Sequence, residues 1–316
     1  MADALGINAR LLGSTETVYG TAPADNWSKL PFVSAELGSV QGLLAADVLG
    51  LGRDPAAPAR DKVDLDGQVV VPVDLRAIGQ WLTWMLGPPA TTDTAGAAPY
   101  THVFASGAAA LPSFALEIGL PDKGDYFVNT GLGLDSLALA FQRSGQAAAT
   151  IQLVGQKETR AGVSAGGTPA TATFTRFGQF QGTIRKDGTA LGNVVSASAT
   201  FANGLEKAEV IREDGLIAGW LPGVTAFTGQ MTVRFTDNVL LALAEAGGTC
   251  ELTLGYVLSA SQSLLLTAHE VHLPKPKQKI AGPGGLQATY DWQAARHEGL
   301  GKMLTVTLIN DVESYS

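Results

Sequence analysis

The sequence predicts a mainly β protein made of two tandem units, each a β-sandwich or β-barrel with one flanking α-helix. Three observations lead to this fold class. Apolar and polar residues alternate in many stretches of the 316-residue chain, glycine is abundant with 38 copies, and the first half resembles the second at a constant offset. Alternation is typical of strands that bury one face, and glycine-rich turns join such strands.

Three stretches show the alternation most clearly. Residues 114–120, 250–256 and 304–308 each place an apolar side chain at every second position. Successive side chains of a strand point to opposite faces, so each stretch is expected to be a strand with one buried face. Cys250 belongs to the apolar set and is expected to be a small buried hydrophobe. Because it is the single cysteine, an intrachain disulfide and a cysteine-based zinc site are both excluded.

Two other segments are predicted to be helices. Residues 74–86 and 236–246 carry apolar side chains at spacings of three and four, which is the pattern of a helix with one buried face. Asp74 and Thr236 are the expected N-terminal caps, and glycine follows each segment where the helix should end.

The internal resemblance is clearest between residues 31–87 and 193–249, which align without gaps at an offset of 162. Gly67-Gln68 falls on Gly229-Gln230, and the strand that follows each pair keeps the same alternation and runs into a predicted helix. Further along, with insertions, the residues that can be matched are Gly131, Gly133, Phe141 and Gln142 with Gly282, Gly284, Trp292 and Gln293. The sequence therefore indicates a duplication. Two unrelated β-domains that share common glycine and valine positions are the alternative.

The duplication predicts a first unit at residues 1–160 and a second at 161–316. A small, polar, glycine-rich stretch at 159–171 is the expected linker. Two further segments, 87–100 and 272–285, are rich in proline or lysine and are predicted to be long loops. Loops of this length in a compact domain are usually functional or ordered by a partner.

Composition argues against several functions. Only 16% of residues are charged, the net charge is −8 and the pI is about 5.0. A sequence-specific nucleic-acid binder normally carries a basic face, and none is evident. The N-terminal residues lack the basic and apolar regions of a signal peptide, and no apolar stretch reaches the about 20 residues of a membrane span. We therefore expect synthesis in the cytoplasm and no membrane partner.

No catalytic, cofactor-binding or metal-ligating residues are predicted. His269 and His272 are three positions apart, a spacing that fits neither one face of a strand nor a zincin helix. The Gly-Leu-Gly-Leu run at 131–134 lacks the third glycine and the following helix of a dinucleotide loop. The lysine-rich run 275–279 is expected to be a solvated or partner-facing loop.

A set of short motifs, in a fixed order along the chain, carries a resemblance to a known family. The motifs are Glu16-Thr17-Val18-Tyr19-Gly20-Thr21-Ala22-Pro23, Trp27, Leu30-Pro31-Phe32, Gly67-Gln68, Leu111-Pro112-Ser113-Phe114-Ala115-Leu116-Glu117, Tyr290-Asp291-Trp292-Gln293-Ala294 and Leu304-Thr305-Val306-Thr307-Leu308-Ile309-Asn310-Asp311. Their order resembles that of the tail tube proteins of long-tailed (siphophage-type) bacteriophages and prophages.

The resemblance implies two tail-tube-like units and a virion structural protein rather than an enzyme. Subunits of such proteins form rings whose inner strands pair into one β-barrel, and the rings stack into the hollow tube through which phage DNA is ejected. Two units per chain imply a trimeric ring with pseudo-sixfold symmetry. A hexamer with one tube domain and one decorating domain per chain is the alternative.

Partners and location are also implied by the resemblance. The protein would contact other copies of itself and, in the tail, the tape measure protein, the tail terminator and the distal tail proteins. Genomic DNA would pass through without sequence-specific binding. After synthesis in the host cytoplasm the protein would reside in the virion tail.

Physical arguments support assembly. Open strand edges promote aggregation unless they are paired, and closing a ring pairs them. The segments 87–100 and 272–285 are the predicted contacts between rings, and the acidic balance predicts a lumen that repels DNA phosphates. Two other readings remain open at this point: another β-rich virion part, such as a capsid decoration or baseplate protein, and a carbohydrate-binding β-sandwich module or enzyme, which would require clustered carboxylates and aromatics.

Overall fold

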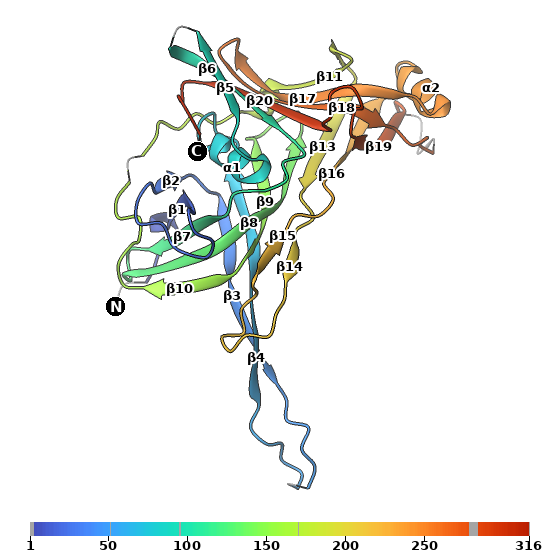
Figure 1. Cartoon of the computed structure of the whole chain (residues 1–316). Coiled ribbons are helices and arrows are strands. Elements are labelled where there is room, and N and C mark those ends of the chain that lie inside the picture. Colours follow the sequence, from blue (N-terminus) through green and yellow to red (C-terminus); the bar gives the residue numbers. More distant parts are fainter. Residues whose placement is uncertain (1–2, 51, 95, 170, 278–283, 316) are drawn as a thin grey trace.

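A computed structural model describes residues 3–315 except 51, 95, 170 and 278–283. In this part of the chain the protein is mainly β, as predicted (Figure 1). The helices are α1 (Ala77–Leu86) and α2 (Val239–Ala246). The strands are β1 (Arg10–Thr15), β2 (Ser28–Leu30), β3 (Ser34–Leu44), β4 (Ala59–Pro72), β5 (Ala90–Thr94), β6 (Ala97–Ala105), β7 (Phe114–Leu120), β8 (Asp125–Phe141), β9 (Ala148–Gly155), β10 (Lys157–Ala161), β11 (Gly182–Lys186), β12 (Thr189–Ala190), β13 (Val194–Ala202), β14 (Glu206–Ala208), β15 (Gly219–Leu221), β16 (Ala226–Arg234), β17 (Thr249–Ser259), β18 (Gln262–His272), β19 (Gln287–Ala295) and β20 (Leu304–Asn310).

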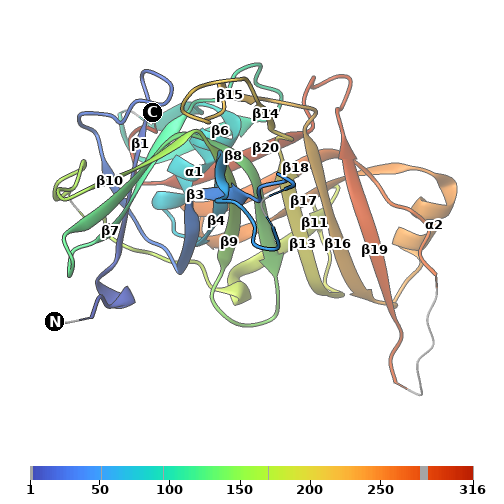
Figure 2. The same cartoon turned by 90° about the horizontal axis from the view of Figure 1, so that it is seen from below.

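The strands form two main layers, which are joined at one end. The first has the order β3-β4-β9-β8-β13-β16-β19, and all its neighbours are antiparallel. Figure 2 shows much of this layer from below. The second has the order β12-β11-β17-β18-β20-β6-β5. The end of β18 turns away from β20 and pairs with β19, which connects the layers. A third set, β2-β1-β7-β8-β10, uses the first half of β8.

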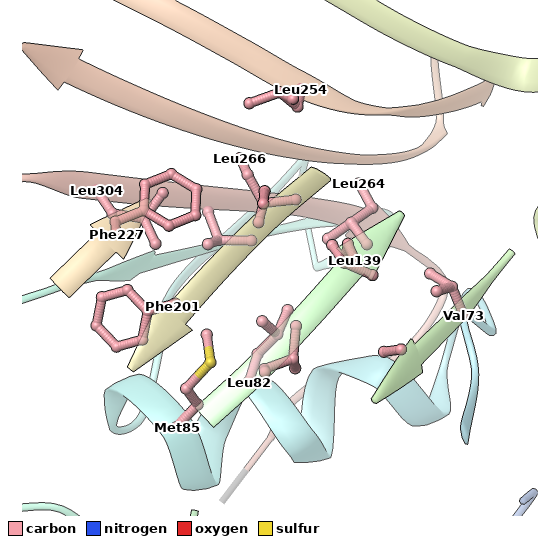
Figure 3. Close-up of a cluster of buried hydrophobic side chains, with 14 of the residues drawn as sticks. Val73, Leu82, Met85, Leu139, Phe201, Phe227, Leu254, Leu264, Leu266 and Leu304 are labelled. Atoms are coloured by element: carbon pink, nitrogen blue, oxygen red, sulfur yellow. The ribbon is translucent and has the colours of Figure 1, made fainter. Parts of the chain in front are cut away.

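Apolar side chains from both main layers meet in one core (Figure 3). The side chains labelled in Figure 3 are Val73, Leu82, Met85, Leu139, Phe201, Phe227, Leu254, Leu264, Leu266 and Leu304. Helix α1 is part of this core, because eight of its ten residues are buried. Trp84 of α1 stacks on Phe114 with ring centroids 4.1 Å apart. Helix α2 has a single buried residue, Leu240.

Both predicted helices exist, and the predicted capping side chain is found at α1 but not at α2. Asp74 precedes α1, and its Oδ1 atom accepts hydrogen bonds from the backbone N–H groups of Arg76 (3.0 Å) and Ala77 (2.8 Å). At α2 the prediction of Thr236 as the cap is wrong. Asp237 takes that place, because its Oδ1 atom accepts a hydrogen bond from Val239 N–H at 3.0 Å.

The strand pairings of the first half recur, one by one, in the second half. In the first half β1 pairs with β2 and β7, β3 with β4, β4 with β9, and β8 with β7, β9 and β10. In the second half β11 pairs with β12 and β17, β13 with β16, β16 with β19, and β18 with β17, β19 and β20. A β5–β6 hairpin is added in the first half and a β14–β15 ribbon in the second.

The register of the paired strands also repeats. Ala35 lies opposite Val69, and Ala197 lies opposite Met231, so both members of the pair are displaced by 162. β7–β8 and β17–β18 each carry an irregularity close to their matching ends. The expected match of Phe141 with Trp292 is wrong, because Trp292 is on β19, whose counterpart by pairing is β9 and not β8.

The glycines of the aligned Gly-Gln pairs have a shared structural reason. A Cβ atom on Gly67 would lie 2.1 Å from the carbonyl oxygen of Glu36, and one on Gly229 would lie 2.0 Å from that of Ser198. Glu36 and Ser198 are themselves related by the offset of 162. In both halves, therefore, glycine permits the same close approach of two strands.

The segments predicted to be irregular are partly regular. Most of the predicted loop 87–100 lies in β5 and β6, and β6 pairs with β20. The predicted linker 159–171 begins with the end of β10, so the irregular connection starts at Gly162. Of the predicted loop 272–285, residues 278–283 lie outside the described residues.

Candidate assembly surfaces

One face of the first layer points away from the core and is polar. Its side chains come from alternate positions of six neighbouring strands: Gln68, Gln152, Ser136, Ala138, Ser198, Thr200, Thr228, Gln230, Thr232, Thr289, Asp291 and Gln293. We call this surface the polar face. The alternation that buries one side of each strand produces it, since the opposite side must carry residues that tolerate water.

Hydrogen bonds between neighbouring strands hold the side chains of the polar face. Gln152 Nε2 donates to Gln68 Oε1 at 2.9 Å, and Gln230 Nε2 donates to Asp291 Oδ1 at 2.8 Å. Gln68 and Gln230 are equivalent at the offset of 162, so this position makes a hydrogen bond to the neighbouring strand in both halves, with Gln68 as the acceptor and Gln230 as the donor. Amide, hydroxyl and carboxylate groups give the surface hydration without positive charge.

The electrostatic character of the polar face is neutral to acidic. Asp66 and Asp291 are exposed carboxylates at its alternate positions. The basic side chains at the same alternate positions of these strands include Lys62, toward the free end of β4 and 3.4 Å from Asp64, and Arg234, at the end of β16. A surface of this kind has little attraction for a phosphate backbone, because binding to nucleic acid depends on lysine and arginine contacts.

A second surface is the long β3–β4 hairpin, which projects from the body of the protein (Figure 1). Five large apolar side chains near its tip are exposed: Val40, Leu43, Leu44, Val48 and Leu49. The side chain of Leu49 is 94% exposed. An exposed apolar cluster on a projecting segment marks a protein interaction site, because isolated surface hydrophobics do not normally gather in this way.

Ion pairs from the second half brace the hairpin near the body. Lys207 of β14 lies 3.1 Å from a carboxylate oxygen of Asp64 and 2.8 Å from one of Asp66, both in β4. Lys62 of β4 reaches back to Glu209 at 2.7 Å. Burial acts to raise the pKa of Asp64, but the hydrogen bond and charge of Lys207 outweigh it and hold the pKa below its usual value.

The histidines and the cysteine that the sequence offered as possible metal ligands make contacts typical of structural residues. His269 Nε2 lies 2.7 Å from the hydroxyl of Thr305 and its Nδ1 atom 3.4 Å from Glu251, whereas His272 lies 3.6 Å from Glu270. Within the described residues, no group of three or more histidine, cysteine, aspartate or glutamate side chains is placed to hold a metal ion. Burial raises the pKa of the Cys250 thiol to about 11, so it stays protonated at neutral pH.

The Gly-Leu-Gly-Leu run at 131–134 makes room for an aromatic contact. A Cβ atom on Gly133 would lie 2.5 Å from the ring of Trp220, and one on Gly131 would lie 3.0 Å from Tyr19. Trp220 Nε1 donates to the carbonyl of Gly131 at 3.0 Å. The glycines of this run therefore allow Trp220 of the β14–β15 ribbon, in the second half, to pack against β8 of the first half.

Sequence reasoning did not identify the projecting hairpin. Gly50, Gly52, Pro55 and Pro58 are typical of a turn. The apolar side chains before them resemble those of a buried strand, so the sequence did not show that the two strands project from the body. In the part of the chain that the structure covers, no helix is long and apolar enough to cross a membrane.

Comparison with known proteins identifies a family. A family model described as phage tail tube protein matches residues 6–294, which is nearly the whole chain. This range runs from the segment before β1 through almost all of β19 and so includes the polar face, the hairpin and its brace. No curated protein matches the chain.

Proposed function

The chain belongs to the phage tail tube protein family, and on that premise we propose that its copies close into rings that stack into a hollow tube through which phage DNA is ejected. The family is structural, so the protein is a structural component of the phage tail. The polar face is the single observation that carries the finer proposal. A wide antiparallel sheet with one dry and one wet face, closed by its neighbours, encloses a water-filled channel.

The proposed ring contains three copies. The recurrence of seven strand pairings in both halves supports two units per chain, at residues 1–160 and 161–316. Each unit contributes four strands to the first layer if the end of β18 is counted with β19. Three chains then give six copies of the unit and pseudo-sixfold symmetry. A hexamer with one decorating domain per chain is less consistent with two halves that share one layer through β8 and β13.

The channel would favour passage of DNA over binding. The amide, hydroxyl and carboxylate groups of the polar face offer no cationic partner along most of its width, so the phosphate backbone can slide. Thr289→Lys, which adds a positive charge to the polar face, should slow DNA ejection from assembled phage. Thr189→Lys, which adds the same charge on β12 in the other layer, should leave the rate unchanged. Equal rates in both variants would contradict the proposed role of the polar face.

The β3–β4 hairpin is the proposed contact between rings. It projects beyond the body, its tip is apolar, and stacking requires a surface that reaches the next ring. The hairpin takes the role that was predicted for segment 87–100, because much of that segment belongs to the β5–β6 hairpin. At the ends of the tube the same surfaces would meet the tail terminator and the distal tail proteins, and the tape measure protein would occupy the channel during assembly.

Negative-stain electron microscopy of the purified full chain tests the proposal. Rings or hollow tubes are expected, and rotational averaging should give threefold symmetry with a pseudo-sixfold outline. Sixfold symmetry with one chain per repeat would reject the trimer. A chain that remains a single subunit at all concentrations and salt conditions, and that does not enter tails when supplied to phage lacking this protein, would reject the function.

A further inference from the structure

We propose that His102 is a pH-dependent latch for residues 311–315, which we call the strap. At neutral pH the uncharged imidazole of His102 helps to hold the strap against helix α1, and protonation of the imidazole in mild acid releases the strap. The inference concerns the fold of the single subunit, so it stands or falls independently of ring assembly.

The strap follows β20 and lies beside α1 (Figure 1). It forms no helix or strand, so its position depends on side-chain contacts and a few hydrogen bonds. The ring of Tyr315 fills the space next to Gly79 of α1, where a Cβ atom would overlap the ring. The Tyr315 hydroxyl donates to the carbonyl of Arg76 at 2.7 Å, and Asp311 lies 2.6 Å from the Arg76 guanidinium. The strap therefore closes over the N-terminal end of α1.

His102 of β6 is fully buried and makes hydrogen bonds with uncharged groups. Its Nε2 atom lies 2.9 Å from the carbonyl oxygen of Val312, in the strap, and 3.2 Å from Oδ1 of Asn310. Because both of these oxygens accept hydrogen bonds, Nε2 carries the proton, and Nδ1 accepts a hydrogen bond from the hydroxyl of Thr91 at 2.8 Å. The neutral imidazole is thus satisfied at both nitrogens, and one of its bonds goes to the strap.

Asn310 couples the latch to the rest of the strap. Its Oδ1 atom also accepts a hydrogen bond from Val312 N–H at 3.0 Å. Its Nδ2 atom donates to the Tyr315 hydroxyl at 2.6 Å and to the carbonyl of Leu75 at 2.8 Å. A change in the bonds of His102 therefore reaches both Val312 and Tyr315 through one buried side chain.

The elements around the imidazole carry several titratable groups. They are Asp93 of β5, Tyr100 of β6, Asp311, Glu313 and Tyr315 of the strap, and Arg76 next to α1. The ring centroids of Tyr100 and Tyr315 lie 6.5 Å and 4.8 Å from that of the imidazole. Asp93 accepts a hydrogen bond from Gly96 N–H, and the hydrogen bond with Arg76 holds the pKa of Asp311 below its usual value. Within the described chain, no carboxylate lies within hydrogen-bond distance of the imidazole.

Protonation of His102 would place a charge in a buried site without a counter-charge. Nδ1 would become a donor, and the Thr91 hydroxyl would have to turn in order to accept from it. Burial lowers the pKa of His102 below its ordinary value of about 6.5, although the hydrogen bonds with Val312 and Asn310 act in the opposite direction. The unfavourable charge is relieved when water reaches the ring, which requires that one neighbour moves away.

The strap is the neighbour that can move most easily. Strands β5, β6 and β20 are held in ladders of backbone hydrogen bonds, whereas the strap is irregular. The strap also borders a groove of about 430 Å³, which is lined on other sides by Ala77 and Phe174 among others. It can therefore open without displacing another strand or helix, as weakly held segments of folded proteins commonly do.

The strap shares an anchor with the connection between the two halves. Besides its contact with Asp311, the Arg76 guanidinium donates to the carbonyl of Thr173 at 2.8 Å and to the hydroxyl of Thr175 at 3.2 Å. Release of the strap would remove Asp311 from this group. Mild acid would therefore weaken the place where the connection is fixed to the first half.

The direction of the pH effect follows from the lowered pKa. The pKa of His102 is lower with the strap closed than with it open, so closure loses stability as pH falls below the open-state pKa of about 6.5. The loss ends once pH reaches the closed-state pKa. Between about pH 7.5 and about pH 5.5 the ratio of open to closed strap should rise by up to about tenfold.

Hydrogen exchange of the Val312 amide in the unassembled full chain measures this ratio, because that N–H is bonded to Asn310 when the strap is closed. Its protection factor, corrected for the intrinsic exchange rate at each pH, should fall by up to about tenfold over the same range. In His102→Gln, whose side chain is uncharged at every pH, the protection factor should stay constant. His272→Gln, at an exposed histidine, is the matched control and should behave like the parent.

Three results would overturn the inference. They are a constant protection factor in the parent, the same fall in His102→Gln, and equal protection of Val312 and of Val306 in the centre of β20, which would mean that the strap opens only when the whole chain unfolds. If His102→Gln does not fold, proton NMR of the parent decides. The imidazole signal that remains after assignment of His269, His272 and His297 should titrate below about pH 6.5, and titration at or above that value would exclude the latch.

Discussion

Replacing Gly67 by alanine tests the close strand approach that both halves share. The added Cβ would lie 2.1 Å from the Glu36 carbonyl oxygen, whereas carbon–oxygen contacts between strands are about 3.3–3.6 Å. The two strands would have to separate by more than about 1 Å. Gly67 also has a φ of +153°, a conformation that residues with a Cβ rarely adopt. Overpacking costs about 1–3 kcal/mol and backbone strain a similar amount, so we expect a loss of about 3 kcal/mol.

The measurement is urea unfolding followed by tryptophan fluorescence, under conditions in which the subunit is unassembled. Gly229→Ala should cost at least as much as Gly67→Ala, because its Cβ would lie 2.0 Å from the Ser198 carbonyl oxygen and 2.5 Å from the Trp292 ring. Gly192→Ala is the matched control: no atom lies within 4 Å of its Cβ position, and the change should stay within about 0.5 kcal/mol. If Gly67→Ala were as stable as Gly192→Ala, the inferred steric reason for the conserved pattern of the two halves would be wrong.

Three further predictions concern the hairpin, its brace and the core. Leu49→Asp should abolish tube formation in electron micrographs but leave the unfolding free energy of the subunit unchanged, since Leu49 is 94% exposed. Normal tubes would show that the hairpin tip does not form the contact between rings. Lys207→Ala should lower the unfolding free energy by less than about 1 kcal/mol at pH 7. Because the pKa of Asp64 is lowered in the folded state, the stabilisation from this ion pair is fully present above the unfolded-state pKa and is lost as pH falls through the folded-state pKa. The difference in unfolding free energy between the variant and the parent should therefore shrink in acid. A difference that does not depend on pH would argue against the ion pair. Trp84→Ala should cost about 3–5 kcal/mol in the same unfolding assay, because the side chain is fully buried against Phe114, and a loss below about 1 kcal/mol would contradict that packing.

The alternation in the sequence was sufficient to predict the strands that bury one face. β7 coincides with the predicted 114–120, and β17 and β20 contain the other two predicted stretches. Both helices were also predictable from their apolar spacing. Their caps were less so, because aspartate and threonine both favour the position before a helix, and Asp237 is adjacent to Thr236.

The partners of a strand could not be read from local pattern. β8 is one continuous strand of 17 residues, but its two parts pair with different strands and belong to different sheets. The apolar alternation shifts phase between Leu134 and Leu137, where β8 has an irregularity against β9, but this shift does not identify the new partner strands. For the same reason the sequence alignment placed Trp292 against Phe141, although pairing places β19 with β9. The expected loop 87–100 became mostly strand because β20, more than 200 residues away, supplies a partner for β6.

The exposed surfaces were predicted in kind but not in place. The low content of charged residues predicted that part of the protein surface is covered by other subunits in an assembly. The sequence did not show which apolar residues stay exposed in the single subunit. The tip of the β3–β4 hairpin and the outer side of α2 carry large apolar side chains of the same types as those in the core. Only the arrangement of the surrounding strands shows that nothing within the described chain covers them.

The equivalent strand pairs β3–β4 and β13–β16 end differently in the two halves, and this asymmetry affects the periodicity of a tube. β3 and β4 extend into a free arm, whereas β13 and β16 give way to the β14–β15 ribbon, which folds back and is anchored by Trp220 and Lys207. In a ring of three chains, arms would then leave one rim at intervals of 120° and not 60°. Successive rings could then dock only in orientations that differ by a third of a turn. A ring of six identical units would allow six such orientations, whereas three chains with two different halves allow three.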